Sequence, residues 1–375
     1  MRIELLELRR VSMPLVTPFR TSFGTSHTRE TFVLRLVTDE GVDGWAECAA
    51  DVEPLYSEEF LAGSELVLRD HLLPRVLALG DDLTAGRVQE ALEPVSGNPM
   101  AKHVLETAVL DAELKTVGVS FGRYLGAVRD RVPAGVSVGI MDSHAELLDH
   151  VERYLAQGYR RIKLKIEPGW DVEPVRLVRE RFGDELLLQV DANAAYTLAD
   201  ARQLARLDPF DLLLMEQPLN EADIRGHASL ARVVRTPICL DESIRSARDA
   251  ATAIALGACD VINIKPARVG GYLEARRVHD VAHANGVPVW CGGMLETGIG
   301  RAANVALAAL PGFTLPGDTS ASDRYFRHDV TPPFVLDDGH LPVPTAAGIG
   351  VAVLTDALDE VTTSTEVLFP TRSTV

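Results

Sequence analysis

Ionisable residues recur at an almost constant interval through the middle of the chain, and this spacing constrains the fold more than any other feature. Lys165, Asp191, Glu216, Asp241 and Lys265 are separated by 26, 25, 25 and 24 residues. Each lies at or just past the end of a short apolar run typical of a β-strand, and amphipathic stretches typical of helices follow. A βα unit takes about 25 residues, so the interval predicts equivalent positions on neighbouring parallel strands.

The apolar runs after Val132 alternate with helical stretches and predict a parallel sheet joined by right-handed crossovers. The expected strands are residues 134–140, 161–166, 186–190, 212–215, 238–240, 261–264, 287–290 and a weaker 313–315. Such strands close into a barrel whose strand C-terminal ends surround one mouth. The polar residues should therefore converge at that mouth, where we expect the functional site.

The sequence on either side of this repeat follows different patterns. Residues 1–44 read as strands around a loop at 18–24, and residues 57–117 place apolar residues at helical spacing. Towards the C-terminus the repeat stops, and turns containing proline or glycine separate short strands. We expect the N-terminal part of an α+β domain at 1–130, a barrel at 131–322 and a segment at 323–375 that returns to the first domain.

Charge and cysteine content restrict the class of partner. The 54 acidic and 37 basic residues give a net charge of −17, which disfavours general affinity for nucleic acid or anionic membranes. The four cysteines are scattered without a CxxC pair, as expected of reduced core thiols. No run of about 18 uncharged apolar residues occurs. We expect a cytoplasmic homo-oligomer that acts on a small-molecule carboxylate.

Asp191, Glu216 and Asp241 are the candidate metal ligands. Three carboxylates on consecutive strands repel one another strongly unless a cation neutralises them. Ligands that are all oxygen suit a hard ion such as Mg²⁺ or Mn²⁺. The alternative is that each acid only caps the helix that follows it. Their common spacing favours the metal site.

Lysines complete the predicted chemistry. Lys163 and Lys165 face the same side of their strand because alternate side chains of a strand share a face, and Lys265 ends a strand nearly opposite in the ring. A lysine acts as a base only when its pKa falls from about 10.4 towards 7–8, and burial, a second ammonium group and a divalent cation all lower it. The alternative for any one lysine is a side chain that extends to solvent. Together they predict removal of a proton α to a carboxylate, with the enediolate held by the metal and Lys163.

Motifs from end to end of the chain resemble those of a known family. In the barrel they are Arg161-Ile-Lys-Leu-Lys165, Asp191-Ala-Asn193, Glu216-Gln-Pro218, Asp241-Glu-Ser243, Asn263-Ile-Lys265 and Arg268-Val-Gly-Gly271. The others are Pro18-Phe-Arg-Thr-Ser-Phe-Gly24, Gly139-Ile-Met-Asp142, Trp290-Cys-Gly-Gly-Met-Leu-Glu-Thr-Gly298 and Leu315-Pro-Gly-Asp-Thr-Ser320. The set resembles the muconate-lactonizing branch of the enolase superfamily and, more narrowly, the o-succinylbenzoate synthase / N-acylamino acid (N-succinylamino acid) racemase family.

The resemblance implies a modified TIM barrel, (β/α)₇β, under an α+β capping domain formed by both termini. It implies a Mg²⁺ site at Asp191, Glu216 and Asp241, with Lys165 and Lys265 as the acid/base pair and Lys163 steadying the enediolate. The positions that fall in the family's substrate pocket and closing loop are Ser137, Asn193, Gly293, Met294, Asp318, Phe19 and Phe23. The implied reactions are racemisation of N-acylamino acids, dehydration to o-succinylbenzoate in menaquinone synthesis, or both at one site.

Other interpretations remain open at this point. Dipeptide epimerisation would need a group that holds the substrate's free ammonium, and the sequence shows none; another muconate-cycloisomerase-like reaction is a further alternative. A metal-free aldolase would form a Schiff base on one strand lysine. A non-catalytic barrel would only bind acidic metabolites. Glu242 either supports the metal site or lies in the first turn of a helix.

Overall fold

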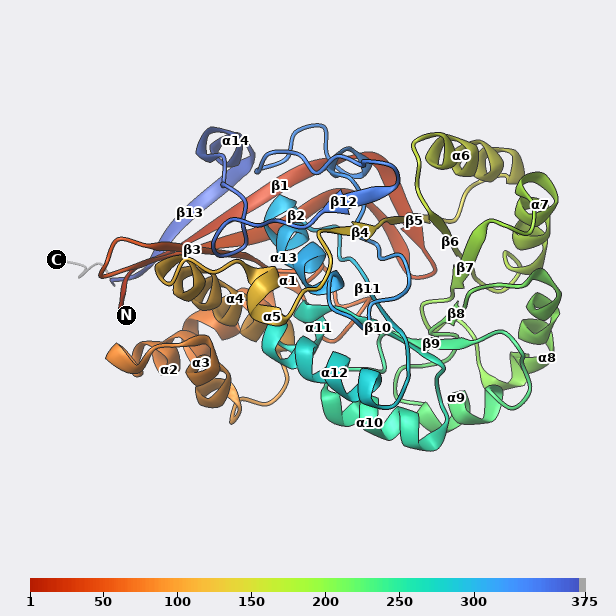
Figure 1. Cartoon of the computed structure of the whole chain (residues 1–375), viewed down its shortest axis with the longest axis horizontal. Helices are drawn as coiled ribbons and strands as arrows, with labels where there is room; N and C mark the ends of the chain where they lie inside the picture. The colour runs from red at the N-terminus through yellow and green to blue at the C-terminus, as the bar shows by residue number, and fades with distance from the viewer. Residues whose placement is uncertain (371–375) are drawn as a thin grey trace.

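The structure is a computed structural model and describes residues 1–370. Figure 1 shows an antiparallel sheet with helices packed against it, next to a curled parallel sheet surrounded by helices. The chain starts in the antiparallel part, follows the parallel sheet and returns to the antiparallel part. The expected α/β fold, a barrel-like sheet with an α+β cap, is confirmed.

The cap sheet contains strands from both ends of the chain. Its order is β13-β1-β2-β3, with β1 (Ile3–Thr21), β2 (Gly24–Thr38), β3 (Asp43–Glu47) and β13 (Thr362–Phe369). Apolar residues alternate along β1 and β2, so one sheet face packs against the cap helices. These helices are α1 (Leu61–Val67), α2 (Leu73–Leu77), α3 (Ala85–Leu92) and α4 (Pro99–Thr116), with a π-helical turn (Leu68–Leu72) between the first two; α5 (Phe121–Leu125) follows.

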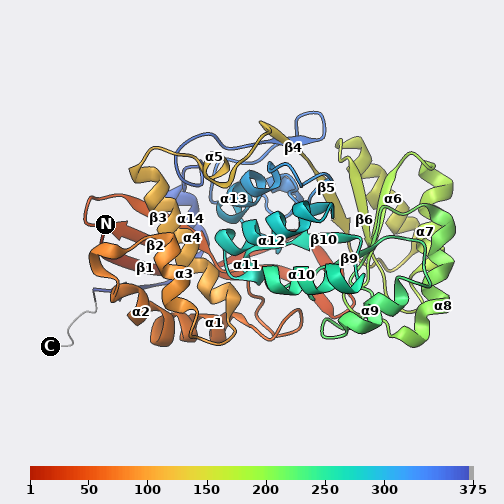
Figure 2. The same cartoon turned by 60° about the horizontal axis from the view of Figure 1, so that its bottom comes forward.

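The parallel sheet follows the predicted repeat. Its strands lie side by side in chain order: β5 (Gly135–Val138), β6 (Arg161–Lys165), β7 (Leu187–Asp191), β8 (Met215–Glu216), β9 (Ile238–Leu240), β10 (Val261–Ile264) and β11 (Val289–Cys291). The helices between them are α6 (His144–Ala156), α7 (Val172–Phe182), α8 (Ala201–Leu204), α9 (Ile224–Leu230), α10 (Ala247–Leu256), α11 (Pro266–Val269) and α12 (Tyr272–Ala284), and α13 (Gly298–Ala308) follows β11. Figure 2 shows helices along the outside of the curled sheet.

The predicted eighth strand is not a regular strand. Phe313 instead makes an isolated parallel bridge to Val289 of β11, and Gly317 makes another to Ala134 next to β5. The Gly135 N–H donates to the Gly317 carbonyl at 2.7 Å. Pro316 interrupts this segment and has no N–H to donate, which prevents a continuous ladder. Residues 313–317 nevertheless join the two edge strands of the sheet.

The C-terminal segment returns to the cap. Strand β12 (His340–Pro342) pairs with β4 (Arg131–Pro133), and α14 (Thr355–Val361) leads into β13, which pairs with β1. The segment therefore contacts both the start of the predicted barrel, through β4, and the cap sheet, through β1. The domain limits at residues 130 and 322 remain a prediction. Among residues 1–370, the model contains no helix whose length and apolar character would suit a membrane span.

Two buried carboxylates of the cap hold helix N-termini of the barrel. Glu47, at the end of β3, accepts the backbone N–H of Thr297, the N-cap of α13, at 3.0 Å. Glu106 on α4 accepts the N–H of Leu273, in the first turn of α12, at 3.1 Å. Burial raises the pKa of Glu47 to about 7 and that of Glu106 to about 8. These contacts set the position of the cap on the barrel.

Candidate active site

The parallel register brings the ends of neighbouring strands together. Lys165 lies opposite Asp191, and Asp191 lies opposite Glu216 on the next strand. Asp241 directly follows β9, and Lys265 directly follows β10. The predicted metal ligands and lysines are all buried, none more than 7 % exposed. The structure therefore places these charges within one protected region.

The first group of charges surrounds Lys163. Its Nζ lies 3.0 Å from Glu216 Oε2, 3.2 Å from Asp191 Oδ2 and 2.7 Å from Asp318 Oδ2. Lys165 Nζ lies 2.6 Å from the same Asp191 oxygen. These two lysines neutralise acids from three different segments of the barrel.

The second group surrounds Asp241. Lys265 Nζ lies 2.8 Å from Asp241 Oδ2, and Arg268 forms an ion pair with the other carboxylate oxygen. The hydroxyl of Tyr56, from the cap, accepts from Lys265 Nζ at 3.0 Å and from Arg268 Nη1 at 3.2 Å. Lys265 also lies 4.4 Å from the centre of the Tyr56 ring. A cap residue thus touches one of the two predicted acid/base lysines.

Burial and charge shift the pKa values in this region in different directions. Burial raises the pKa of Glu216, and the charge of Asp191 raises it further. Burial also acts to raise the pKa of Asp191, but Lys165 and Lys163 outweigh it and the pKa is lowered. Burial lowers the pKa of Lys165, with Lys163 adding to the effect. Burial is the largest single effect on Lys265 and acts to lower its pKa, but Tyr56, Glu242 and Glu216 together outweigh burial and the pKa is raised. A divalent cation close to Lys265 would act in the opposite direction, towards the lower pKa that a base requires.

The chemistry of the carboxylates fits a hard divalent cation. Asp191, Glu216 and Asp241 offer only oxygen donors, and their buried negative charges require cations close by. Within residues 1–370, no three acidic, histidine or cysteine side chains surround a common point closely enough to hold an ion as they stand. The carboxylates are directed to Lys163, Lys165 and Lys265 instead, so holding a metal requires them to turn from these lysines.

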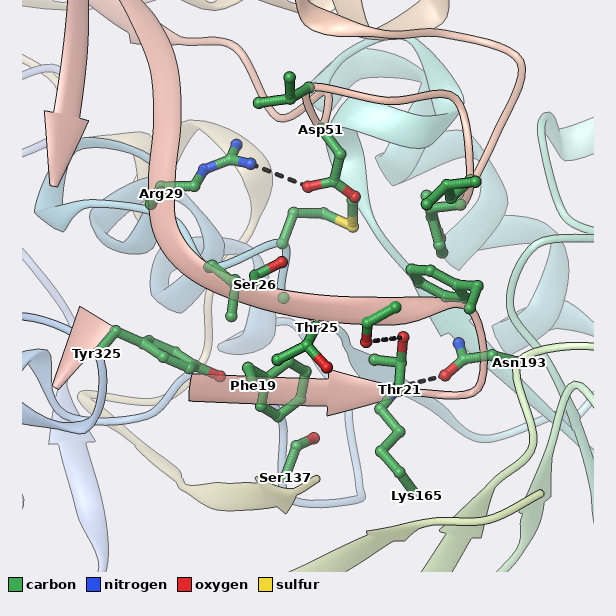
Figure 3. Close-up of a pocket in the computed structure, with 18 of the residues that line it drawn as sticks. Phe19, Thr21, Thr25, Ser26, Arg29, Asp51, Ser137, Lys165, Asn193 and Tyr325 are labelled. Atoms are coloured by element: carbon green, nitrogen blue, oxygen red, sulfur yellow. Dashed lines mark hydrogen bonds and ion pairs between the residues drawn. The ribbon is translucent and has the colours of Figure 1, made fainter. Parts of the chain in front are cut away.

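A cavity of about 420 Å³ lies over these charges and is lined by both the cap and the barrel. The three lysines line it, and so do the predicted pocket residues Phe19, Phe23, Ser137, Asn193, Gly293, Met294 and Asp318. Figure 3 shows Phe19 and Thr21 on the cap hairpin facing Ser137, Lys165 and Asn193 from the barrel. The structure thus brings the predicted residues together, and their individual roles remain a prediction.

The cap hairpin is held against the barrel near this cavity. The N–H of Ile140, just after β5, donates to the carbonyl of Arg20 on β1 at 3.0 Å. A Cβ on Gly139 would come too close to the Arg20 backbone, which explains why a glycine precedes Ile140. Phe19 therefore reaches the cavity next to Arg20, the residue whose backbone is hydrogen-bonded to the barrel.

Asp318 has a role that its predicted place in the substrate pocket did not suggest. Its Oδ1 lies 2.8 Å from Nη1 of the buried Arg161, and its Oδ2 contacts Lys163 and accepts from Ser137 Oγ at 3.2 Å. Arg161 lies 5.2 Å from the Trp290 ring, inside the barrel. Alternate side chains of β6 share a face, so Arg161 lies on the same face as Lys163 and Lys165. The sequence pattern could therefore have indicated that Arg161 points into the barrel.

Other contacts were missing from the sequence-based description. Glu242, whose role was open, accepts from Asn193 Nδ2 at 3.0 Å, and Asn193 Oδ1 accepts from Lys165 Nζ at 2.7 Å. Glu242 thus supports the site through Asn193. Arg268, which the sequence showed only as part of a motif, contacts Asp241 from the short helix α11. Tyr56 lies in a cap loop without any periodic pattern, so no sequence pattern could have indicated it.

Comparisons with known proteins agree with this geometry. Residues 5–126 match the mandelate racemase / muconate lactonizing enzyme N-terminal domain, and residues 146–357 match the enolase C-terminal domain-like family. An N-succinylamino acid racemase from Amycolatopsis sp is 66% identical over 97% of this chain and 98% of its own. An o-succinylbenzoate synthase from Geobacillus kaustophilus is 48% identical over 94% and 93% of the two chains.

The solved structures give the same result. An enolase superfamily member from Listeria innocua superposes with a TM-score of 0.93, covering 98% of this chain and 99% of that one at 41% identity. Members of this superfamily generally use a divalent metal ion. The chain therefore belongs to the enolase superfamily, in the family of N-succinylamino acid racemases and o-succinylbenzoate synthases.

Proposed function

We propose that this protein removes the proton α to the carboxylate of N-succinylamino acids and racemises them, and that it forms o-succinylbenzoate by dehydration at the same site. The observation that carries the proposal is the pair Lys165 and Lys265. They end strands four positions apart in the sheet, they line one cavity, and three buried carboxylates lie between and around them. Such a pair can approach one carbon atom from two sides.

In the proposed reaction, the neutral amine of one lysine takes the α-proton and the ammonium group of the other returns a proton to the opposite face. Exchanging the roles of Lys165 and Lys265 converts the other enantiomer. Lys163, ion-paired with acids from three segments, provides positive charge for the oxygen that becomes negative in the enediolate. In the dehydration, one lysine removes the proton and then protonates the departing hydroxyl group.

Asp191, Glu216 and Asp241 would hold the divalent cation, Mg²⁺ in our proposal. When bound, such an ion supplies positive charge that makes the α-proton of a carboxylate more acidic. Asn193 and Glu242 keep Lys165 in place, and Tyr56 contacts Lys265 from the cap. The expected cytoplasmic location and homo-oligomeric state remain part of the proposal.

The environment of Asp318 supports an acylated substrate. A dipeptide would bring a free ammonium group, which needs an acid in the pocket. Asp318 lines the cavity, but both of its oxygens already contact cations, Arg161 and Lys163. An N-acyl group carries no such positive charge and needs no further acid.

The test uses the purified chain with Mg²⁺ and two substrates. We expect loss of optical rotation from an N-succinyl-L-amino acid, and formation of o-succinylbenzoate, followed by its ultraviolet absorbance, from the cyclohexadiene precursor. Lys165→Ala should lower both activities by about 10²–10⁴-fold. A folded wild-type protein that converts neither substrate would refute the proposal, and activity on only one would restrict it to that reaction.

A further inference from the structure

Arg324 is a buried cation without a negatively charged partner. Arg324 is the last residue of the short 3₁₀ turn Ser322–Arg324, and it is 7% exposed. One nitrogen, Nη2, donates to the Ser137 carbonyl at 2.9 Å, whereas Nε and Nη1 are buried and have no hydrogen-bond partner. No acidic side chain among residues 1–370 forms an ion pair with it. A buried guanidinium in this state is costly, and an anion would remove the cost.

The unpaired guanidinium lies directly behind the wall of the active-site cavity. Its Cζ is 5.7 Å from the centre of the Phe19 ring, 4.9 Å from that of Tyr325 and 5.1 Å from that of Tyr154. Phe19 and Tyr325 both line the cavity, and Figure 3 shows them near each other above Ser137. Rotation of either ring would expose the unpartnered nitrogens to a bound molecule.

The other cations around the cavity already have partners. Arg29 contacts Asp51 at 3.2 Å and donates to the Cys48 carbonyl. Arg20 lies near Asp142 and Glu167, at 3.4 and 3.6 Å. Within residues 1–370, Arg324 thus differs from them in forming no ion pair with a carboxylate, so it is available for a second negative charge on the substrate.

The distance from the reacting centre suits the succinyl group. Lys165 Nζ lies 5.9 Å from the same Phe19 ring centre that lies 5.7 Å from Arg324 Cζ, so the two groups are less than about 12 Å apart. An extended succinyl arm places its terminal carboxylate about 6 Å from the α-carbon. A base contact at one end and a hydrogen bond at the other, each about 3 Å, span the remaining distance.

We propose that Arg324 binds the terminal carboxylate of the substrate's succinyl group. The inference rests on the proposed function, because both N-succinylamino acids and o-succinylbenzoate carry this group. Arg324 then makes the site selective for dianionic substrates, while Lys163 and the cation that the three carboxylates would hold bind the carboxylate next to the reacting carbon. Phe19 and Tyr325 cover the guanidinium when the arm is absent.

The first experiment compares two substrates that differ only in charge. N-succinyl-L-phenylalanine has the terminal carboxylate, and its succinamyl analogue has a neutral amide of the same shape. We expect Arg324→Met to lower the ratio of their kcat/KM values by about 10- to 100-fold, the loss of one charge-assisted hydrogen bond, mainly through the KM of the succinyl substrate. Arg324→Lys should restore part of the ratio. Arg160→Met removes an exposed cation that precedes β6 and pairs with Asp338, and as the control it should leave the ratio unchanged.

The second experiment measures binding without turnover. N-succinylglycine has no stereocentre, and calorimetry compares its affinity with that of N-succinamylglycine for the wild type and Arg324→Met. We expect the wild type to prefer the charged ligand and the variant to lose this preference. If the wild type racemises N-succinyl substrates but Arg324→Met keeps the same ratio and the same binding preference, this inference is wrong. If the wild type racemises no N-succinyl substrate, the proposed function fails instead, and the binding data still show whether Arg324 recognises the arm.

Discussion

Replacing Glu47 by glutamine tests how the cap is held on the barrel. The Glu47 carboxylate accepts the Thr297 N–H at 3.0 Å and also the Thr297 hydroxyl, at the start of α13. Burial raises its pKa from 4.5 to about 7, with the charge of Glu296 also raising it, although the Thr297 hydroxyl opposes the change. Glutamine retains an acceptor oxygen but cannot lose a proton.

The raised pKa means that the folded state binds the proton of Glu47 more tightly than the unfolded state does. Between pH 4.5 and pH 7 the unfolded chain has lost this proton while the folded chain still holds it. The free energy of unfolding of the wild type should therefore fall as pH rises through this range. A difference from 4.5 to about 7 corresponds to about 3 kcal/mol. Relative to the wild type, Glu47→Gln should gain stability by up to this amount between pH 5 and pH 8.

The assay is urea unfolding followed by tryptophan fluorescence at several pH values between 5 and 8. Trp45 lies two residues before Glu47 in β3 and reports on the same sheet. Glu4→Gln removes the same charge from an exposed position on β1 and should follow the pH dependence of the wild type. Parallel curves for Glu47→Gln and the wild type across this range would refute the reasoning.

The other predictions concern the bases, the metal and the cap packing. Lys165→Ala and Lys265→Ala should each stop α-hydrogen exchange in D₂O, followed by NMR, from only one enantiomer; equal exchange from both enantiomers in either variant would contradict two opposed bases. EDTA should abolish turnover and Mg²⁺ should restore it. Activity that is unchanged by EDTA, together with covalent trapping of a carbonyl substrate by borohydride, would instead indicate a Schiff-base enzyme. Gly44→Ala should lower the Tm because a Cβ there overlaps the backbone oxygen of Ala108 on α4, at a cost of about 3 kcal/mol. Gly86→Ala, with open space around its Cβ on α3, is the control, and an equal loss in both variants would contradict the packing argument.

The barrel was predictable because its information is local and periodic. Each strand end carries its charged residue at a similar position in a repeated unit, so the parallel register alone brings Lys165, Asp191 and Glu216 together. The segment at 313–315 was harder to predict, because its apolar residues resemble a strand but Pro316 limits it to isolated bridges.

The contacts between distant segments could not be predicted in the same way. Tyr56 reaches Lys265 from a cap loop, and its position depends on how two separately patterned parts pack together. Asp318 was placed in the pocket, but its pairing with Arg161 and Lys163 depends on how residues 313–317 close the ring. Arg324 shows the same limit, since only the packed structure reveals that a charged side chain lacks a partner.

The antiparallel pairing of β1 with β13 has a consequence for the order of folding. Arg9 of β1 pairs with Thr365 of β13. This pairing cannot form until β13 has been translated, after the whole barrel. Contacts this far apart in the chain form slowly, because a very long loop must close before they contribute. We therefore expect the barrel to fold during translation while β1 is still an unpaired edge strand of the cap sheet. Catalytic activity should appear last, after β13 has paired with β1 and the hairpin that carries Phe19 has taken its final position.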